Sequence, residues 1–218
     1  MVDFSAWQIL TNLVWAARWT VLLSAIAFAC GGTLGLGVLL IRVSRSGVLR
    51  ALAKVFIELF QGTPLLMQLF LLFFGLALLG FDVSPWLAAS VALTLWTAAF
   101  LAEIWRGCVD AIPPGQWEAS SSLAMTYLEQ MRHVILPQAA RIAIAPTVGF
   151  SVQVVKATAL ASIIGFTEIT KAGTMLNNAT FKPFLVYALV AAIYFSLCYP
   201  LSRLARWLEV RSNVDAVH

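Results

Sequence analysis

Residues 19–41, WTVLLSAIAFACGGTLGLGVLLI, are 23 consecutive positions without a charged side chain. At ~1.5 Å of rise per residue, a helix of about 20 apolar residues crosses the ~30 Å hydrocarbon core of a bilayer. The first charge of the chain is Asp3, so no basic segment of the kind found in signal peptides precedes this stretch. The stretch also exceeds the roughly 7–15 apolar residues of a cleaved signal. We therefore expect it to remain as a spanning helix.

Similar apolar stretches recur along the rest of the chain. Charge-free runs cover residues 59–81, 83–102 and 183–202, and the run 142–167 is interrupted only by Lys156. Apolar residues make up 61% of the 218 positions and charged residues 11%, against roughly 45–50% and about 25% in soluble domains. This composition excludes a water-soluble globule and an intrinsically disordered chain. The sequence also lacks the alternating segments of about ten residues that are typical of membrane β-barrels.

The sequence therefore predicts an all-α integral membrane protein with about five transmembrane helices. We expect one transmembrane domain over residues 1–218, with a connecting segment, about 107–140, between the third and fourth spans. The expected spans are about 15–41, 57–79, 85–105, 142–167 and 184–207.

The orientation follows from the basic residues at the ends of these runs. Ten of them fall on one side, namely Arg42, Arg45, Arg50, Lys54, Arg106, Arg132, Arg141, Arg203, Arg206 and Arg211. Three fall on the other side, namely Arg18, Lys171 and Lys182. Because Lys and Arg are enriched in cytoplasmic loops, we expect the N-terminus outside, and the C-terminus and the connecting segment in the cytoplasm.

Neither the net charge nor the cysteines indicate a nucleic-acid or metal ligand. The net charge of +4 comes from residues at the ends of apolar runs, not from a basic soluble face, so nucleic acid is not an expected partner. Cys30, Cys108 and Cys198 have no metal-ligand spacing and are expected to be small buried apolar residues.

The connecting segment has an amphipathic helical pattern. Pro113 and Pro114 end the third span, and a helix is expected over residues 116–134, with Pro137 marking its end. Apolar side chains recur there at steps of three and four, at Trp117, Leu123, Ala124, Tyr127, Leu128, Met131 and Ile135. Most membrane-surface helices are rich in Lys and Arg, whereas this one has few. The pattern favours docking to a protein, with contact to lipid as the alternative.

Three short stretches in this segment resemble the EAA loop of bacterial ABC importer permeases. They are Glu118-Ala119-Ser120, then Ala124, then Ile135-Leu136-Pro137. The family pattern is Glu-Ala-Ala, three residues, Gly, nine residues, then Ile-x-Leu-Pro. Ser120 replaces the second alanine and Ala124 replaces the glycine, and both replacements are small.

Further stretches are similar to the polar amino-acid subfamily of these permeases, and the resemblance covers roughly residues 15–210. The first, Gln61-Gly62-Thr63-Pro64-Leu65 with Gln68, has Gln61 where that subfamily has arginine. Residues 102–107, AEIWRG, and 112–119, IPPGQWEA, match it as well. In residues 156–160, KATAL, Ala157 and Ala159 stand where the family usually has Asp and Ser.

The resemblance implies a permease subunit in the bacterial inner membrane that imports a small polar amino acid. It implies a separate ATPase subunit dimer that carries ATP and Mg, a second permease subunit, identical or paralogous, and a periplasmic or lipid-anchored amino-acid-binding protein. The residues that would couple the loop to the ATPase are Glu118, Ala119, Ala124, Met125, Arg132, Ile135 and Pro137. The chain contains no Gly-x-x-x-x-Gly-Lys-[Ser/Thr], so we expect no catalytic, cofactor-binding or metal-binding residue in it.

Polar side chains within the apolar runs are the candidates for a substrate pathway. A Lys at the centre of a span costs roughly 2.5–3.5 kcal/mol on insertion scales, so such residues normally face protein or water. The candidates are Thr94, Thr97, Gln153, Lys156 and Glu168. The alternative is structural, with Lys156 paired internally and the threonines bonded within their own helix.

Two other spacings predict local contacts. Glu103 and Arg106, three positions apart, are expected to pair at one end of the third span. Gly31 and Gly35 form a Gly-x-x-x-Gly pattern, which allows close helix packing either within the chain or with another subunit.

Two competing functions remain on the sequence alone. A secondary transporter driven by an ion gradient would favour paired intramembrane acids and an internal repeat, and neither is seen in the sequence. An intramembrane enzyme would need His, Cys or paired carboxylates at membrane depth, whereas His133 and His218 both lie outside the apolar runs.

Overall fold

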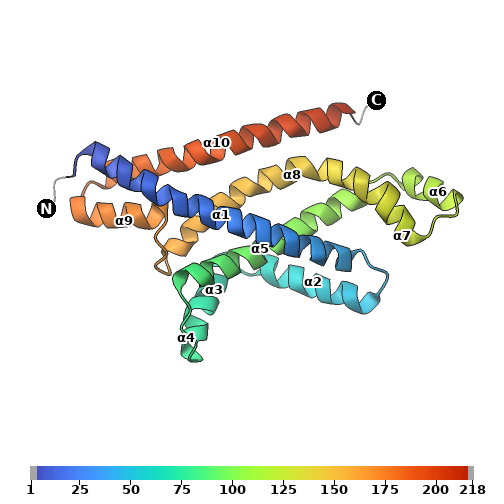
Figure 1. Cartoon of the computed structure of the whole chain (residues 1–218), viewed down its shortest axis with the longest axis horizontal. Helices are drawn as coiled ribbons and strands as arrows, with labels where there is room; N and C mark the ends of the chain where they lie inside the picture. Colours follow the sequence, from blue (N-terminus) through green and yellow to red (C-terminus); the bar gives the residue numbers. More distant parts are fainter. Residues whose placement is uncertain (1–3, 216–218) are drawn as a thin grey trace.

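A long N-terminal helix is the first element of the fold. The computed structural model describes residues 4–215, and all regular structure in that range is helical (Figure 1). Helix α1 (Ala6–Arg42) begins at Ser5, whose hydroxyl accepts from the backbone N–H of Gln8, while the Gln8 side chain accepts from the Ser5 N–H. This reciprocal cap satisfies two of the free N–H groups at the helix start. The helix therefore begins nine residues before the expected span.

The second span is broken, and the expected helix over 57–79 is not a single helix. Helix α2 (Gly47–Gly62) is followed by α3 (Leu65–Phe70), a π-helical turn η1 (Leu71–Gly75) and α4 (Leu76–Leu78), with a bend of 100° between the two halves. Pro64 has no N–H and forces the preceding residue out of the helical region, and Thr63 is extended accordingly, with ψ 141°. In Figure 1, α3 and α4 turn away from the line of α2.

A buried glutamine holds this bend. Gln68 Nε2 donates to the Phe60 carbonyl at 3.0 Å, the Thr63 carbonyl at 3.1 Å and the Thr63 hydroxyl at 2.9 Å. The last carbonyls of a helix lack partners within the helix, so the Gln68 amide satisfies groups that the break leaves free.

Helix α5 (Pro85–Asp110) packs closely against α1. Ser84 caps its start, and Pro85 occupies the first turn, where a missing N–H is tolerated. A Cβ added to Gly31 would lie 2.7 Å from Thr97 Cβ, and one added to Gly35 would lie 2.9 Å from the Ala98 carbonyl oxygen. The Gly-x-x-x-Gly pattern therefore serves packing between α1 and α5 within this chain.

The connecting segment contains two helices instead of one. Helix α6 (Pro114–Ser122) and α7 (Tyr127–Gln130) are separated by a turn, and α7 continues through a π-helical turn η2 (Met131–Ile135) into α8 (Leu136–Ala157). The expected single helix over 116–134 is wrong, because the chain leaves the helical conformation at Ala124. Pro137 ends no helix, since it lies in the first turn of α8, where proline is tolerated.

The remaining elements complete the set of spans. A short 3₁₀ helix η3 (Thr158–Ser162) extends α8, then come α9 (Ile169–Thr180) and the long α10 (Pro183–Asp215). Within residues 4–215, four helical segments are long and apolar enough to span a membrane, or five if the bent α2–α4 pair counts as one. Figure 1 places the end of α1, the α6–α7 pair and the later part of α10 at one end of the molecule. That end carries most of the basic residues.

Candidate functional site

The connecting segment presents most of its expected contact residues to the outside. Glu118, Ala119, Ala124 and Arg132 are exposed, as is Pro137, and Met125 is half-buried. Ile135 differs, because it is fully buried in a cluster with Cys108, Val109 and Ile112 at the end of α5. Ile135 therefore fixes the segment to α5 and is not available to a partner.

Aromatic residues join this segment to the connection between α1 and α2. The Tyr127 hydroxyl donates to the Val43 carbonyl at 2.7 Å, and the Arg45 guanidinium lies 4.9 Å from the centre of the Tyr127 ring. The Trp117 ring stacks on Tyr127 with the ring centres 6.3 Å apart. The helical periodicity identified Trp117 and Tyr127 as one apolar face. It could not show a contact to Val43, which lies 84 positions away.

Ala124 has a backbone conformation that L-residues rarely adopt. Its φ is 56°, in the left-handed region, and it follows α6 directly. Gln130 Nε2 closes the turn by donating to Ser121 Oγ at 2.9 Å and to the Met125 carbonyl at 3.1 Å. Glycine adopts this conformation without steric cost, which gives a backbone reason for the glycine of the family pattern. Ala124 therefore lies in the turn between α6 and α7, not within the expected helix over 116–134.

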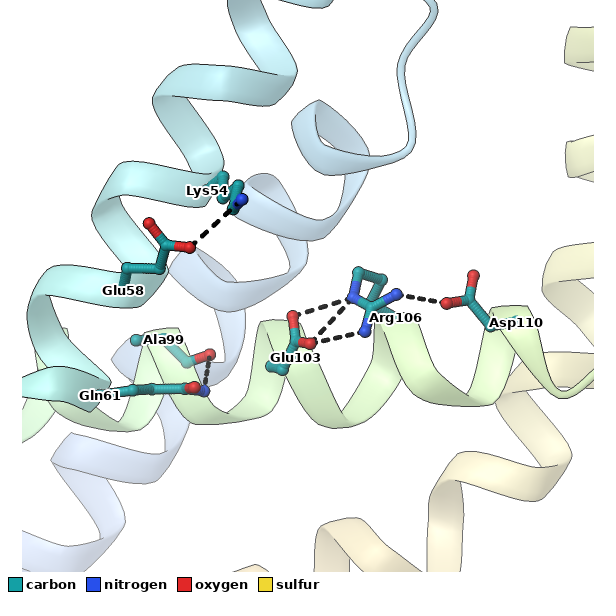
Figure 2. A network of polar contacts seen from close by, with 7 residues as sticks. All are labelled: Lys54, Glu58, Gln61, Ala99, Glu103, Arg106 and Asp110. Atoms are coloured by element: carbon teal, nitrogen blue, oxygen red, sulfur yellow. Dashed lines mark hydrogen bonds and ion pairs between the residues drawn. The ribbon is translucent and has the colours of Figure 1, made fainter.

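Polar contacts lie along α5, and one of the contacts drawn in Figure 2 joins α5 to α2. Arg106 donates to the Glu103 carboxylate, with Nη2 2.6 Å from Oε1, and pairs with Asp110 on its other side. The predicted Glu103–Arg106 pair is confirmed. Figure 2 also shows Gln61 of α2, whose Nε2 donates to the Ala99 carbonyl of α5 at 3.3 Å.

Two of the five pathway candidates share one exposed face. Gln153 and Lys156 are three positions apart on α8, and both side chains are exposed. The structure places Lys156 in the last turn of α8, not near the middle of a span as expected. A cation there is favoured by the negative end of the helix dipole. None of the ion pairs between described side chains includes Lys156, so the internal pair considered as an alternative is not formed among them.

The two threonine candidates lie elsewhere. Thr97 is fully buried where α5 meets Gly31 of α1, and its hydroxyl has no hydrogen-bond partner among the described residues. Thr94 is half-buried, and its carbonyl oxygen would lie 3.0 Å from a Cβ on Gly31. Both residues therefore belong to the packing between α1 and α5.

Glu168 is a buried cap at the start of α9. Its Oε1 accepts from the Lys171 backbone N–H at 2.9 Å, and its Oε2 accepts from the Tyr194 hydroxyl at 2.6 Å. The residue is fully buried, and this burial raises the pKa of the Glu168 carboxyl, although its hydrogen bonds oppose the rise. The five candidates thus lie in three settings: Gln153 and Lys156 share an exposed face of α8, Thr94 and Thr97 lie between α5 and α1, and Glu168 caps α9.

An all-helical membrane subunit with a folded, exposed segment between its later spans is the architecture of an importer's transmembrane subunit. The chain belongs to the family described as binding-protein-dependent transport system inner membrane component, whose model matches residues 31–214. It is a multi-pass inner-membrane permease subunit of an ABC transporter. Within the described residues, no three or more His, Cys, Asp or Glu side chains gather as a metal-binding group would require.

Individual relatives are similar to this chain over most of its length. The chain is 36% identical over 180 residues to the "Probable amino-acid ABC transporter permease protein YckA" of Bacillus subtilis strain 168, covering 83% of this chain and 80% of the relative. It is 32% identical over 215 residues to the glutamine transport system permease protein GlnP of Escherichia coli strain K12, covering 97% and 98%. A crystal structure of an amino acid ABC transporter with histidines superposes with a TM-score of 0.91 at 33% identity, covering 97% of this chain and 99% of that one.

Proposed function

We propose that this permease subunit imports a polar amino acid and is driven by a separate ATPase dimer that docks on the connecting segment. The observation that carries the proposal is the exposed α6–α7 pair, which is attached to α5 and α8 by the chain and to the end of α1 through Tyr127. A surface so attached can pass a displacement by a partner on to three spans. Relatives named for amino-acid and glutamine transport support the substrate class.

The complete transporter then needs further subunits. Four or five spans are too few to enclose a gated pore, so a second permease subunit, identical or paralogous, completes it. ATP and Mg are held by the ATPase, and an extracytoplasmic amino-acid-binding protein delivers the substrate. The uneven distribution of basic residues supports an outside N-terminus and a cytoplasmic C-terminus.

Co-purification tests the docking contact. Glu118 is exposed on α6, so Glu118→Lys reverses a charge at the proposed contact without disturbing the chain's own packing. We expect the parent to retain the ATPase subunit on size-exclusion chromatography in detergent and Glu118→Lys to lose most of it. Glu209→Lys is the matched control, because Glu209 is an exposed acid on α10 outside the connecting segment. Equal retention by all three proteins would contradict the docking proposal.

Lys156 supplies the charge for a substrate contact in this proposal. The side chain is exposed on α8, and no acidic residue pairs with it among those described. A substrate carboxylate is the group that an ammonium recognises, and Gln153 on the same face adds an amide donor and acceptor. The proposed pathway therefore follows this face of α8.

Removal of the Lys156 charge separates a transport role from a structural one. Lys156→Met keeps the approximate length of the side chain, so we expect uptake to fall at least tenfold while the thermal unfolding temperature holds or rises. Lys182→Met, an exposed lysine beyond the spans, is the control and should transport like the parent. Earlier melting of Lys156→Met together with normal uptake would assign Lys156 to structure.

A further inference from the structure

A basic groove lies between the start of α8 and the end of α10. Its volume is about 620 Å³, within the roughly 300–1,000 Å³ typical of small-ligand sites. The lining residues come from the two helices and from the turn after α5, and include Ile112, Arg141, Ile142, Trp207, Leu208 and Arg211. The start of α8 and the later part of α10, which line the groove, lie near the end of the molecule where the α6–α7 pair lies (Figure 1).

Two guanidinium groups provide the charge of this groove. Arg141 comes from α8 and Arg211 from α10, and neither forms an ion pair with a described side chain. The Arg211 guanidinium lies 5.4 Å from the centre of the Trp207 ring, a cation–π distance. Two arginines from different helices converge on one cavity, and an anion is the ligand that such a pair recognises.

Apart from Gln138, the rest of the lining is apolar, and this restricts the kinds of anion that fit the groove. Ile142, Ile144, Ala145 and Leu208 lie beside the arginines on the spanning helices. Trp207 is 55% exposed, as is usual for a tryptophan at the level of lipid headgroups. A free phosphate ion would gain nothing from this apolar wall, whereas an amphiphile places its phosphate at the arginines and its acyl chain along the isoleucines.

We propose that this groove binds the headgroup phosphate of an anionic phospholipid, with an acyl chain along α8 and α10. Basic pockets between transmembrane helices are known sites for such headgroups. The ligand would join two helices that this end of the molecule leaves partly separated, and one of them, α8, continues directly from the connecting segment. The site is distinct from the Lys156 face in its chemistry, since it takes a lipid and not the transported substrate.

Native mass spectrometry of the intact transporter complex in neutral detergent tests the proposal. The complex is titrated with phosphatidylglycerol, with phosphatidylcholine or with inorganic phosphate. We expect phosphatidylglycerol to bind at least tenfold more tightly than phosphatidylcholine, and phosphate to compete only weakly. Since a basic residue near anionic lipid contributes about a fivefold change in affinity, Arg141→Gln and Arg211→Gln should each weaken phosphatidylglycerol binding about fivefold, and the double variant about 25-fold.

A matched pair of charges provides the control. Arg203 and Arg206 are exposed arginines on α10 that do not line the groove, and their double Gln variant should change the affinity less than twofold. Thermal unfolding in phosphatidylcholine confirms that all variants remain folded. If both double variants lose the same affinity for phosphatidylglycerol, the effect comes from the overall surface charge and not from the groove, and the proposal is overturned. Unchanged binding in the groove variant, or full competition by phosphate, would overturn it as well.

Discussion

At the scale of single residues, Ala124 combines a strained backbone with an exposed position. A left-handed conformation costs an L-residue with a Cβ roughly 1–2 kcal/mol, and the cost is absent for glycine. The turn is kept because Gln130 and the chain on both sides determine its path. The left-handed backbone therefore disfavours every side chain with a Cβ at this position, alanine included.

Substitution by glycine at this position should stabilise the turn. We expect Ala124→Gly to raise the free energy of unfolding by about 1 kcal/mol, even though glycine is usually destabilising. Ala119→Gly provides the opposite case, because Ala119 is exposed within α6. Glycine in a helix interior should lower the free energy of unfolding by about 1 kcal/mol. Amide hydrogen exchange in residues 120–130 measures both. Faster exchange in Ala124→Gly would show that the turn does not have this conformation.

Glu168 makes stability depend on pH. Because its pKa is raised in the folded protein, the folded state keeps the proton to a higher pH than the unfolded state. Stability is therefore expected to fall as the pH rises from near the usual value of about 4.5 through the raised pKa. In Glu168→Gln this part of the pH dependence should disappear, with the cap kept by the amide oxygen.

Thermal unfolding in detergent measures this effect from about pH 4, near the usual pKa of a carboxyl group, to about pH 8, which the pKa of a buried carboxyl group can reach. Glu168→Ala is the second variant, and it should lose roughly 1–3 kcal/mol at every pH because the start of α9 and Tyr194 lose their acceptor. A parent curve and a Glu168→Gln curve of the same shape would contradict the role of the buried carboxyl.

At the scale of elements, the α6–α7 pair is attached at three places. It follows α5, it precedes α8, and Tyr127 bonds to the carbonyl of Val43 after α1. The backbone connects the pair to α5 and α8, and the Tyr127 hydrogen bond connects it to the end of α1. A motion of the pair therefore reaches the end of α1 directly through this side-chain contact, and indirectly through α5, which packs against α1.

Removal of one hydroxyl tests this attachment. Tyr127→Phe keeps the ring that packs on Trp117 and lies below Arg45, and it removes only the donor to Val43. A net hydrogen bond contributes about 1 kcal/mol, so the protein should fold normally while fewer amino acids are imported per ATP hydrolysed. Tyr187→Phe, an exposed tyrosine on α10, is the control. An unchanged ratio of transport to hydrolysis would remove the hydrogen bond between Tyr127 and Val43 from the coupling route.

The elements also show how far the sequence could be interpreted. Apolar runs predicted the spanning helices, because every position of a span that faces the hydrocarbon core is stabilised by an apolar side chain. The bend at Pro64 was missed, since a mean hydropathy does not include backbone angles, although a proline after Gly62-Thr63 could have indicated it. The hydrogen bond between Glu168 and Tyr194 was missed for another reason, because the two residues lie 26 positions apart in the sequence.

At the scale of the whole molecule, the candidate residues separate into four regions. Glu118 and its neighbours lie at the end that carries most of the basic residues, and Gln153 and Lys156 lie on one face of α8. Thr94 and Thr97 lie where α5 packs on α1, and Glu168 lies at the start of α9. The sequence interpretation assigned all the polar candidates to one pathway because it used polarity alone. A polar group within a span is satisfied either by the protein or by a ligand. In the structure, packing accounts for the two threonines and helix capping accounts for Glu168.

ATP-driven uptake is the central claim of this account. The most direct test is the uptake of radiolabelled glutamine, glutamate, arginine and histidine into proteoliposomes that contain the permease and the ATPase, with the binding protein outside and ATP inside. We predict that uptake of at least one amino acid requires ATP, continues when ionophores collapse all ion gradients, and is lost in Glu118→Lys. Uptake without ATP that stops when the ion gradients collapse would contradict the account and identify an ion-driven transporter.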